Sequence, residues 1–315
     1  MTNIKEFTFI SEQDQQIISA VKVIPDTPVI GVIQLVHGMA EHKERYLPFM
    51  TYLANHGYVC VMHDHRGHGK SVASKDDLGY FHDKNGTYLI EDIHTLCQLM
   101  KQQYPDVPYF LFGHSMGSLL VRCFCKRYDD EIDALVVCGS PSENKAAKAG
   151  KLLVKAMEKV KGEHYRSDLI QHMAFGAHQK AFPKGESENV WLCSDQSVVK
   201  AYDEDPLCGF VFTLNGFENL FTIMMEVYDA HGWEMKHKAL AIRFIAGGDD
   251  PCIVNEAKFQ QAAGFMKTLG YENVSARLFE GKRHEILNED IKEEVYEDVL
   301  AFYEKVRKQE MIRNS

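Results

Sequence analysis

The sequence predicts an α/β protein with a mostly parallel sheet, helices on both faces of the sheet and an inserted helical segment. Short, nearly continuous apolar runs alternate with segments of helical periodicity, as in parallel sheets whose strands are buried on both sides. This alternation stops between residues 141 and 235, where helical patterns continue without a comparable strand. We therefore expect a core formed by residues 1–140 and 236–315, with a helical cap (lid) inserted at 141–235.

The individual elements follow from the same periodicity. Two extended segments, 6–10 and 16–24, flank a polar turn and predict an antiparallel hairpin at the sheet edge. The strands expected after the hairpin are 31–36, 58–62, 107–112, 134–138, 240–245 and 274–279. Apolar stripes at helical spacing predict helices at 46–54, 89–100 and 291–306 in the core, and a lysine-rich helix at 144–161 in the cap.

Composition excludes several classes of function. The formal net charge of -10 disfavours a nucleic-acid partner, because phosphate binding needs a basic surface. No apolar run approaches the ~20 residues that span a bilayer, and no basic, apolar leader opens the chain, so a cytoplasmic location is expected. The eight cysteines form no Cys-x-x-Cys pair, which favours reduced core residues over metal ligands.

A glycine-flanked serine, Ser115, lies where an apolar strand pattern changes to a helical pattern. The segment 111–118 reads Leu-Phe-Gly-His-Ser-Met-Gly-Ser, so Gly113 and Gly117 stand two residues to either side of the serine. In a nucleophile elbow the turn is so tight that these two positions must lack bulk, and the hydroxyl is lifted clear of the sheet. We therefore predict that Ser115 is a catalytic nucleophile.

A serine nucleophile needs a base and a carboxylate, which follow the serine in that fold in the order acid, then histidine. After the expected strand 240–245 the chain has two adjacent acids, Asp249 and Asp250, and spacing does not choose between them. After the last expected strand comes His284. Because the carboxyl ends of parallel strands meet at one edge of the sheet, these side chains are expected to converge with Ser115.

Two backbone N–H groups are expected to bind the oxyanion that forms on the substrate. One belongs to Met116, directly after the serine, and the other to Met39, in the loop that follows strand 31–36. A competing signal, His63-Asp64-His65-Arg66-Gly67-His68, nearly matches a metal-binding run of binuclear hydrolases. Gly67 replaces the aspartate that would complete such a site, so we expect no metal and interpret the run as a rigid loop beside the crevice.

These motifs together resemble a known family. The segments that carry the resemblance are His37-Gly38-Met39-Ala40-Glu41-His42, the segment 64–71 (Asp-His-Arg-Gly-His-Gly-Lys-Ser), Gly113-His114-Ser115-Met116-Gly117 and Arg283-His284-Glu285. They are similar to the monoacylglycerol lipase and lysophospholipase branch of the α/β-hydrolase superfamily, often termed serine aminopeptidase-like. The resemblance implies an eight-stranded, mostly parallel sheet, a helical cap, and hydrolysis through an acyl-serine intermediate without a cofactor. It also assigns Asp250 as the catalytic acid, because the Asp-Pro of the family pattern falls on Asp250-Pro251.

The resemblance leaves the substrate open, because this fold hosts several chemistries. We expect a small-molecule monoacyl ester, such as a monoacylglycerol or lysophospholipid. The apolar stretch after residue 208 suits an acyl chain and supplies the substrate-binding candidates Phe210, Phe212, Leu214, Phe217 and Met224, although ordinary packing of the cap explains it equally well.

Two alternatives to an esterase stay open. An aminopeptidase or amidase would use cap acids, Asp203, Glu204 and Asp205, to hold a substrate ammonium. A non-catalytic ligand-binding protein of the same fold is disfavoured by the intact set of Ser115, Asp250 and His284.

A stripe of lysines, Lys148, Lys151, Lys155 and Lys159, recurs at helical spacing in the cap. Most such stripes are solvated surface, and the second interpretation of this one is a transient contact with an anionic lipid surface. The sequence makes no prediction of an oligomeric state.

Overall fold

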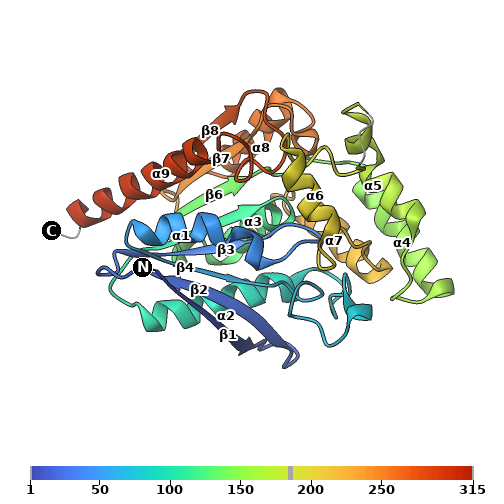
Figure 1. Cartoon of the computed structure of the whole chain (residues 1–315), viewed down its shortest axis with the longest axis horizontal. Helices are drawn as coiled ribbons and strands as arrows, with labels where there is room; N and C mark the ends of the chain where they lie inside the picture. The colour runs from blue at the N-terminus through green and yellow to red at the C-terminus, as the bar shows by residue number, and fades with distance from the viewer. Residues whose placement is uncertain (1, 184–186, 314–315) are drawn as a thin grey trace.

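The computed structural model describes residues 2–183 and 187–313 and contains one eight-stranded sheet, in the order β1-β2-β4-β3-β5-β6-β7-β8 (Figure 1). The strands are β1 (Asn3–Ile10), β2 (Ile17–Ile24), β3 (Gly31–Val36), β4 (Tyr58–His63), β5 (Tyr109–His114), β6 (Ala134–Cys138), β7 (Ala241–Gly247) and β8 (Asn273–Phe279). Strands β3 to β8 pair in parallel, whereas β1 and β2 form an antiparallel hairpin joined antiparallel to β4. The predicted fold class and its edge hairpin are confirmed.

Side chains alternate between the two faces of the sheet along each strand, so a continuous apolar strand presents apolar groups on both faces. Helices cover both faces accordingly. Phe110 and Phe112 of β5 pack with α1 (Leu47–Asn55) and α9 (Lys292–Arg313) on one face. Leu111, between them in sequence, packs on the other face with α2 (Thr87–Gln103), α3 (Met116–Tyr128) and α8 (Glu256–Thr268). The strands β3 to β6 are therefore buried along their whole length, as the continuous apolar runs predict.

Among the described residues between β6 and β7, where the sequence shows no strand pattern, the structure has four helices. They are α4 (Ala147–Lys161), α5 (Asp168–Lys180), α6 (Gln196–Glu204) and α7 (Leu214–Glu226). Figure 1 shows them gathered at one end of the sheet, on the side away from both chain termini. Across residues 2–183 and 187–313, no helix combines the length and the apolar character that crossing a membrane requires.

The junction between β5 and α3 is packed so tightly that it excludes side chains at two positions. A Cβ on Gly117 would lie 2.2 Å from the carbonyl oxygen of Val36 and 2.5 Å from that of His37, both at the end of β3. A Cβ on Gly113 would lie 2.5 Å from the carbonyl oxygen of Gly117. The helix therefore begins in direct contact with the backbone of the neighbouring strand, and Ser115 stands at the contact.

Replacing Gly117 by Ala should destabilise the protein by about 3 kcal/mol, because the new Cβ meets backbone oxygens that move only with β3. Gly264 supplies the matched control, since it lies inside α8 and, among the described residues outside its own stretch of helix, no atom comes within 4 Å of where a Cβ would stand. Gly264→Ala should instead stabilise the protein by up to about 1 kcal/mol through helix propensity. Urea unfolding of both variants measures the difference; equal effects would contradict the steric argument.

Candidate active site

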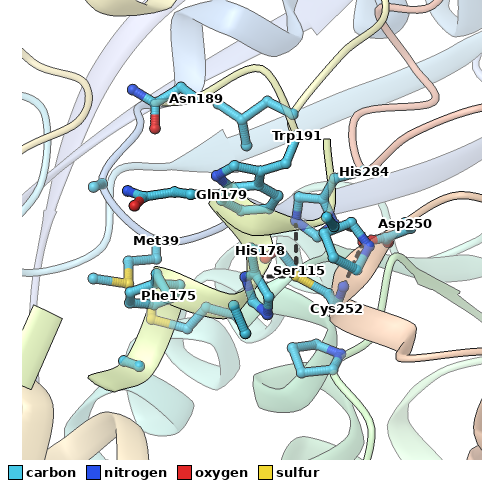
Figure 2. Close-up of a pocket in the computed structure, with 18 of the residues that line it drawn as sticks. Met39, Ser115, Phe175, His178, Gln179, Asn189, Trp191, Asp250, Cys252 and His284 are labelled. Atoms are coloured by element: carbon cyan, nitrogen blue, oxygen red, sulfur yellow. Dashed lines mark hydrogen bonds and ion pairs between the residues drawn. The ribbon is translucent and has the colours of Figure 1, made fainter. Parts of the chain in front are cut away.

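Ser115 lies in a cavity of about 890 Å³ between the sheet edge and the helices that follow β6. Figure 2 shows Ser115, His284 and Asp250 near one another, with His178 of α5 and Trp191, which lies between α5 and α6, beside them. The loops after β3, β5, β7 and β8 all contribute to the lining, as do α5 and α7. The predicted convergence of loops on one crevice is therefore present.

The backbone of Ser115 has the unusual conformation of a tight strand-to-helix turn. Its φ is 54° and its ψ is -120°, in a region that non-glycine residues adopt rarely. The Ser115 N–H donates a hydrogen bond to the Cys138 carbonyl oxygen at 3.0 Å, which ties the turn to β6. A Cβ on Gly38 would lie 3.0 Å from the Ser115 Cβ, so the loop after β3 passes directly beside the serine.

Asp250, and not Asp249, faces His284. Nδ1 of His284 lies 2.9 Å from Oδ2 of Asp250, and both side chains are buried. The other carboxylate oxygen of Asp250 accepts the backbone N–H of Cys252 at 2.8 Å, so the carboxylate is held from both sides. Asp249 is exposed. Because a carboxylate oxygen only accepts, Nδ1 of His284 carries the proton, which leaves Nε2 as the basic nitrogen.

Three residues that the sequence did not single out surround the His284 ring. Cys252 Sγ lies 4.0 Å from His284 Nε2 and 4.0 Å from His178 Nδ1. The Trp191 ring lies 5.1 Å from the rings of both His284 and His178. Burial lowers the pKa of His178 to about 4 and raises the pKa of the Cys252 thiol, so both side chains are neutral near pH 7. The environment of the basic nitrogen is therefore uncharged and partly aromatic.

Met39 and Met116, the predicted oxyanion donors, both line the cavity beside Ser115. The loop that carries Met39 is held by hydrogen bonds on each side. The Gly38 N–H donates to Glu41 Oε1 at 2.7 Å, and the Ala40 N–H donates to His68 Nε2 at 3.2 Å. Met116 is the first residue of α3, where backbone N–H groups have no partner within the helix. Both N–H groups thus belong to rigid backbone next to the serine.

Four buried histidines lie beneath this loop. His65 donates its backbone N–H to His37 Nε2 at 2.9 Å, and its Nε2 lies 3.0 Å from the His37 carbonyl oxygen. Burial and mutual repulsion lower the pKa of His37 and His63 well below the ordinary range, and burial chiefly lowers those of His65 and His68 to about 4 and about 3. The neutral imidazoles of His37, His65 and His68 therefore form hydrogen bonds that support the loop, whereas the ring nitrogens of His63 have no hydrogen-bond partner among the described residues.

Two groups of side chains in the described ranges lie close enough to share a metal ion. One consists of Asp250, Cys252 and His284 and belongs to the cavity just described. The other consists of His42, Asp205 and Cys208, of which His42 and Asp205 already contact each other at 2.9 Å. Neither group includes a histidine of the 63–68 run, in which His65 and His68 instead form hydrogen bonds with the His37 carbonyl oxygen and the Ala40 N–H.

A charged network that sequence reasoning missed lies behind His284. Arg45 binds Glu285 with two nitrogens, at 2.8 and 2.7 Å, and Glu41 at 2.6 Å. Nε2 of His114 lies 3.3 Å from the His284 carbonyl oxygen, and its Nδ1 lies 2.9 Å from the Tyr46 hydroxyl. Burial opposes the charged form of His114, but the nearby Glu41 carboxylate outweighs it and raises the pKa. The His284 backbone is thereby fixed to the loop after β3.

The substrate-binding candidates separate into two groups. Phe210 and Met224 line the cavity, together with Leu119, Phe175, Leu220 and Phe221. Phe212, Leu214 and Phe217 do not line the cavity and are fully buried in the hydrophobic core. The cause is the start of α7, where the Thr213 hydroxyl donates to the Gly79 carbonyl oxygen at 2.8 Å and holds the first turn against the loop after β4.

The acids that an aminopeptidase would use to hold a substrate ammonium lie outside the cavity lining. Asp203 accepts a hydrogen bond from Asn189 at 2.7 Å, and Asp205 pairs with His42 at 2.9 Å. Glu204 is exposed, 3.7 Å from Lys200. These contacts give all three carboxylates structural or surface partners.

Comparison with known proteins relates the chain to hydrolases. The family described as "Serine aminopeptidase, S33" matches residues 27–291. A monoacylglycerol lipase of Mycolicibacterium smegmatis is 26% identical over 281 residues, which covers 88% of this chain and 89% of the relative. Phospholipase YtpA of Bacillus subtilis is 24% identical over 277 residues, covering 88% and 96%. The crystal structure of a thermostable carboxyl esterase from Bacillus coagulans superposes with a TM-score of 0.89 at 28% identity, covering 98% of this chain and 100% of that one.

The buried histidines should make the protein less stable as the pH falls from 6.5 towards 5. In the unfolded chain they bind protons near pH 6.5, whereas in the folded chain their pKa values are lower, so the unfolded state binds more protons in this window. Each such histidine lowers the free energy of unfolding by up to about 1.4 kcal/mol per pH unit. Groups with raised pKa oppose this slope. His42 does so little, because in the unfolded chain it is also largely protonated by pH 5, whereas Glu158, whose pKa burial and the nearby Glu218 raise to about 7, offsets about one of the histidines.

Urea unfolding at pH 7, 6 and 5 measures this slope. His63→Leu should reduce it, because His63 is buried and neither ring nitrogen has a hydrogen-bond partner in the described structure. His231→Asn is the control, since the His231 side chain is 97% exposed and should not change the slope. A stability that stays constant or rises between pH 6.5 and 5 would contradict the prediction.

Proposed function

Because the chain belongs to the serine aminopeptidase S33 family and is an α/β-hydrolase, we propose that it cleaves carboxylic esters with Ser115 as the nucleophile. One observation carries the proposal: Ser115, on a strained turn, faces the same cavity as His284, whose Nδ1 is paired with the buried Asp250 at 2.9 Å. The relatives named monoacylglycerol lipase, phospholipase and carboxyl esterase support an ester as the substrate.

The proposed mechanism begins with proton transfer from Ser115 Oγ to His284 Nε2. Oγ forms a bond to the ester carbonyl carbon, and the N–H groups of Met39 and Met116 bind the oxyanion that develops. Asp250 holds Nδ1–H in place and stabilises the imidazolium. His284 then gives its proton to the departing alcohol, and a water molecule, activated in the same way, releases the acid from Ser115.

Cys252 does not compete with Ser115 as a nucleophile in this scheme, although its sulfur lies 4.0 Å from His284 Nε2. A thiolate, not a thiol, is the reactive form, and burial next to Asp250 keeps the pKa of Cys252 high. The serine, in contrast, reacts from its neutral state with the help of the base. The thiol contributes a weakly polar surface beside the imidazole.

We propose that the acyl group occupies the apolar part of the cavity and that the helices α4 to α7 act as the cap over it. The lining by Phe175 from α5 and by Leu220, Phe221 and Met224 from α7 supports an acyl chain of a monoacylglycerol or lysophospholipid. An aminopeptidase is less well supported, because Asp203, Glu204 and Asp205 lie outside the lining.

Ser115→Ala should lower hydrolysis of p-nitrophenyl acyl esters by at least about 10³-fold and abolish labelling by a fluorophosphonate, because the nucleophile is lost. Ser142→Ala is a matched control, since Ser142 also lines the cavity but its hydroxyl donates to the Ile253 carbonyl oxygen at 2.8 Å. The control should keep both activity and labelling. Turnover by Ser115→Ala at the normal rate would refute the assignment, and faster cleavage of aminoacyl anilides than of acyl esters by the unaltered protein would favour a peptidase.

We also propose that α4 and α5 make a transient contact with a lipid surface. Apolar side chains are exposed on both helices, Leu152 at 63% on α4 and Met173 at 59% on α5, and Lys148 and Lys159 are exposed on α4. Lys155, another member of the predicted stripe, lies 3.3 Å from Glu218 and is partly neutralised. Apolar and basic groups together favour insertion at an anionic interface.

Co-sedimentation with vesicles tests this contact. More protein should bind to vesicles that contain an anionic phospholipid than to phosphatidylcholine vesicles, and added salt should release it because it screens the lysines. Binding that depends on neither lipid charge nor salt would contradict the proposal.

A further inference from the structure

We propose that Tyr202, on helix α6 of the inserted segment, is a positioning residue for the oxyanion donor Met39 and acts through the backbone of Ala40. The inference rests on the proposed function, because it concerns the N–H group that would bind the substrate oxyanion. Tyr202 belongs to the segment after β6, whereas Ala40 follows β3. The helices over the cavity would then contribute to the catalytic geometry as well as to the acyl site.

The peptide groups of Ala40 are held from two directions. From the sheet side, His68 Nε2 accepts the Ala40 N–H at 3.2 Å. From the side of the inserted segment, the Ala40 carbonyl oxygen accepts the Tyr202 hydroxyl at 3.0 Å and the Gly209 N–H at 2.9 Å. Both donors to this oxygen thus come from α6 and the loop that follows it.

Ala40 needs this support because its backbone is in a left-handed conformation, with a φ of 51°. A non-glycine residue in such a conformation costs of order 1 kcal/mol and persists only where its surroundings hold it. Ala40 directly follows Met39, so relaxation of Ala40 would rotate the peptide next to the Met39 N–H. On the other side, the Gly38 N–H is fixed to Glu41 Oε1 at 2.7 Å. The contacts of the inserted segment with Ala40 therefore hold the position of the Met39 N–H from that end of the loop.

The Tyr202 hydroxyl is itself held in place. The ring is buried, and the guanidinium carbon of Arg45 lies 4.9 Å from its centroid. Arg45 is fixed in turn by its paired contacts with Glu285. At the end of α6, Asp205 contacts His42 at 2.9 Å. Burial of His42 lowers its pKa, but hydrogen bonds with Cys208, Glu44 and Asp205 outweigh this effect and raise the pKa to about 11. An ion pair therefore fastens the same helix to the loop after β3.

Tyr202→Phe tests the inference because it removes the hydroxyl and keeps the ring. Loss of a whole oxyanion donor lowers kcat by about 10²–10³-fold. A donor that is only less well positioned should cost less, so we expect a fall in kcat of about tenfold with KM within about twofold. The affinity for an alkylboronic acid, whose adduct places an oxygen in the oxyanion position, should fall in parallel with kcat. Tyr303→Phe is the matched control, because Tyr303 is buried and its hydroxyl also donates to a backbone carbonyl, that of Leu111, at 3.0 Å.

Three outcomes would overturn the inference. The first is an unchanged kcat in Tyr202→Phe. The second is a higher KM at constant kcat in that variant, which would mean that the hydroxyl binds substrate. The third is an equal loss of kcat in Tyr303→Phe, which would mean a general effect of losing a buried hydroxyl. Ser115→Ala separates this inference from the proposed function. If Ser115→Ala is inactive while Tyr202→Phe behaves as the unaltered protein, only the role of Tyr202 fails; if Ser115→Ala stays active, the proposed function fails.

Discussion

The close approach of α3 to the end of β3 is the constraint on which the rest of the site depends. The carbonyl oxygens of Val36 and His37 occupy the space where a side chain at Gly117 would be, so the helix starts against the backbone of the adjacent strand. This contact forces the chain to turn at Ser115 with a positive φ. It also brings the loop after β3 to the same place, with Gly38 packed against the Ser115 side chain. One steric contact thus determines where the serine and one N–H donor lie relative to each other.

Rigid supports surround this junction on several sides. Neutral histidines lie below the loop after β3, and the network of Arg45, Glu285 and Glu41 ties the backbone next to His284 to that loop. From above, Tyr202 and Gly209 bind the Ala40 carbonyl oxygen. Catalysis by electrostatic stabilisation depends on donors that are already in position when charge develops. The buried polar groups beside the loop and the histidine therefore lie where displacement would cost most.

Helices α4 to α7 and the segments between them contribute to the site in two ways. Their apolar residues line one part of the cavity, and their polar residues Tyr202 and His178 reach the loops of the core. The side chains that line the cavity are set by the packing of α7, whose first turn is held against the loop at Gly79. Phe212, Leu214 and Phe217 therefore fill the core, although Phe210 and Leu220, close to them in sequence, face the cavity.

The sequence by itself determined the fold class, the edge hairpin, the strand-to-helix turn at Ser115 and the positions of His284 and the two adjacent acids, because each depends on local periodicity or on residues next to a strand end. The choice of Asp250 over Asp249 by geometry, the contacts of Cys252, His178 and Trp191 with the imidazole, and the hydrogen bond from Tyr202 to Ala40 were decided only by the tertiary structure. These features join segments that are far apart in the chain. Their geometry depends on how the loops at the sheet edge and the helices α4 to α7 pack together, and no local pattern encodes that packing.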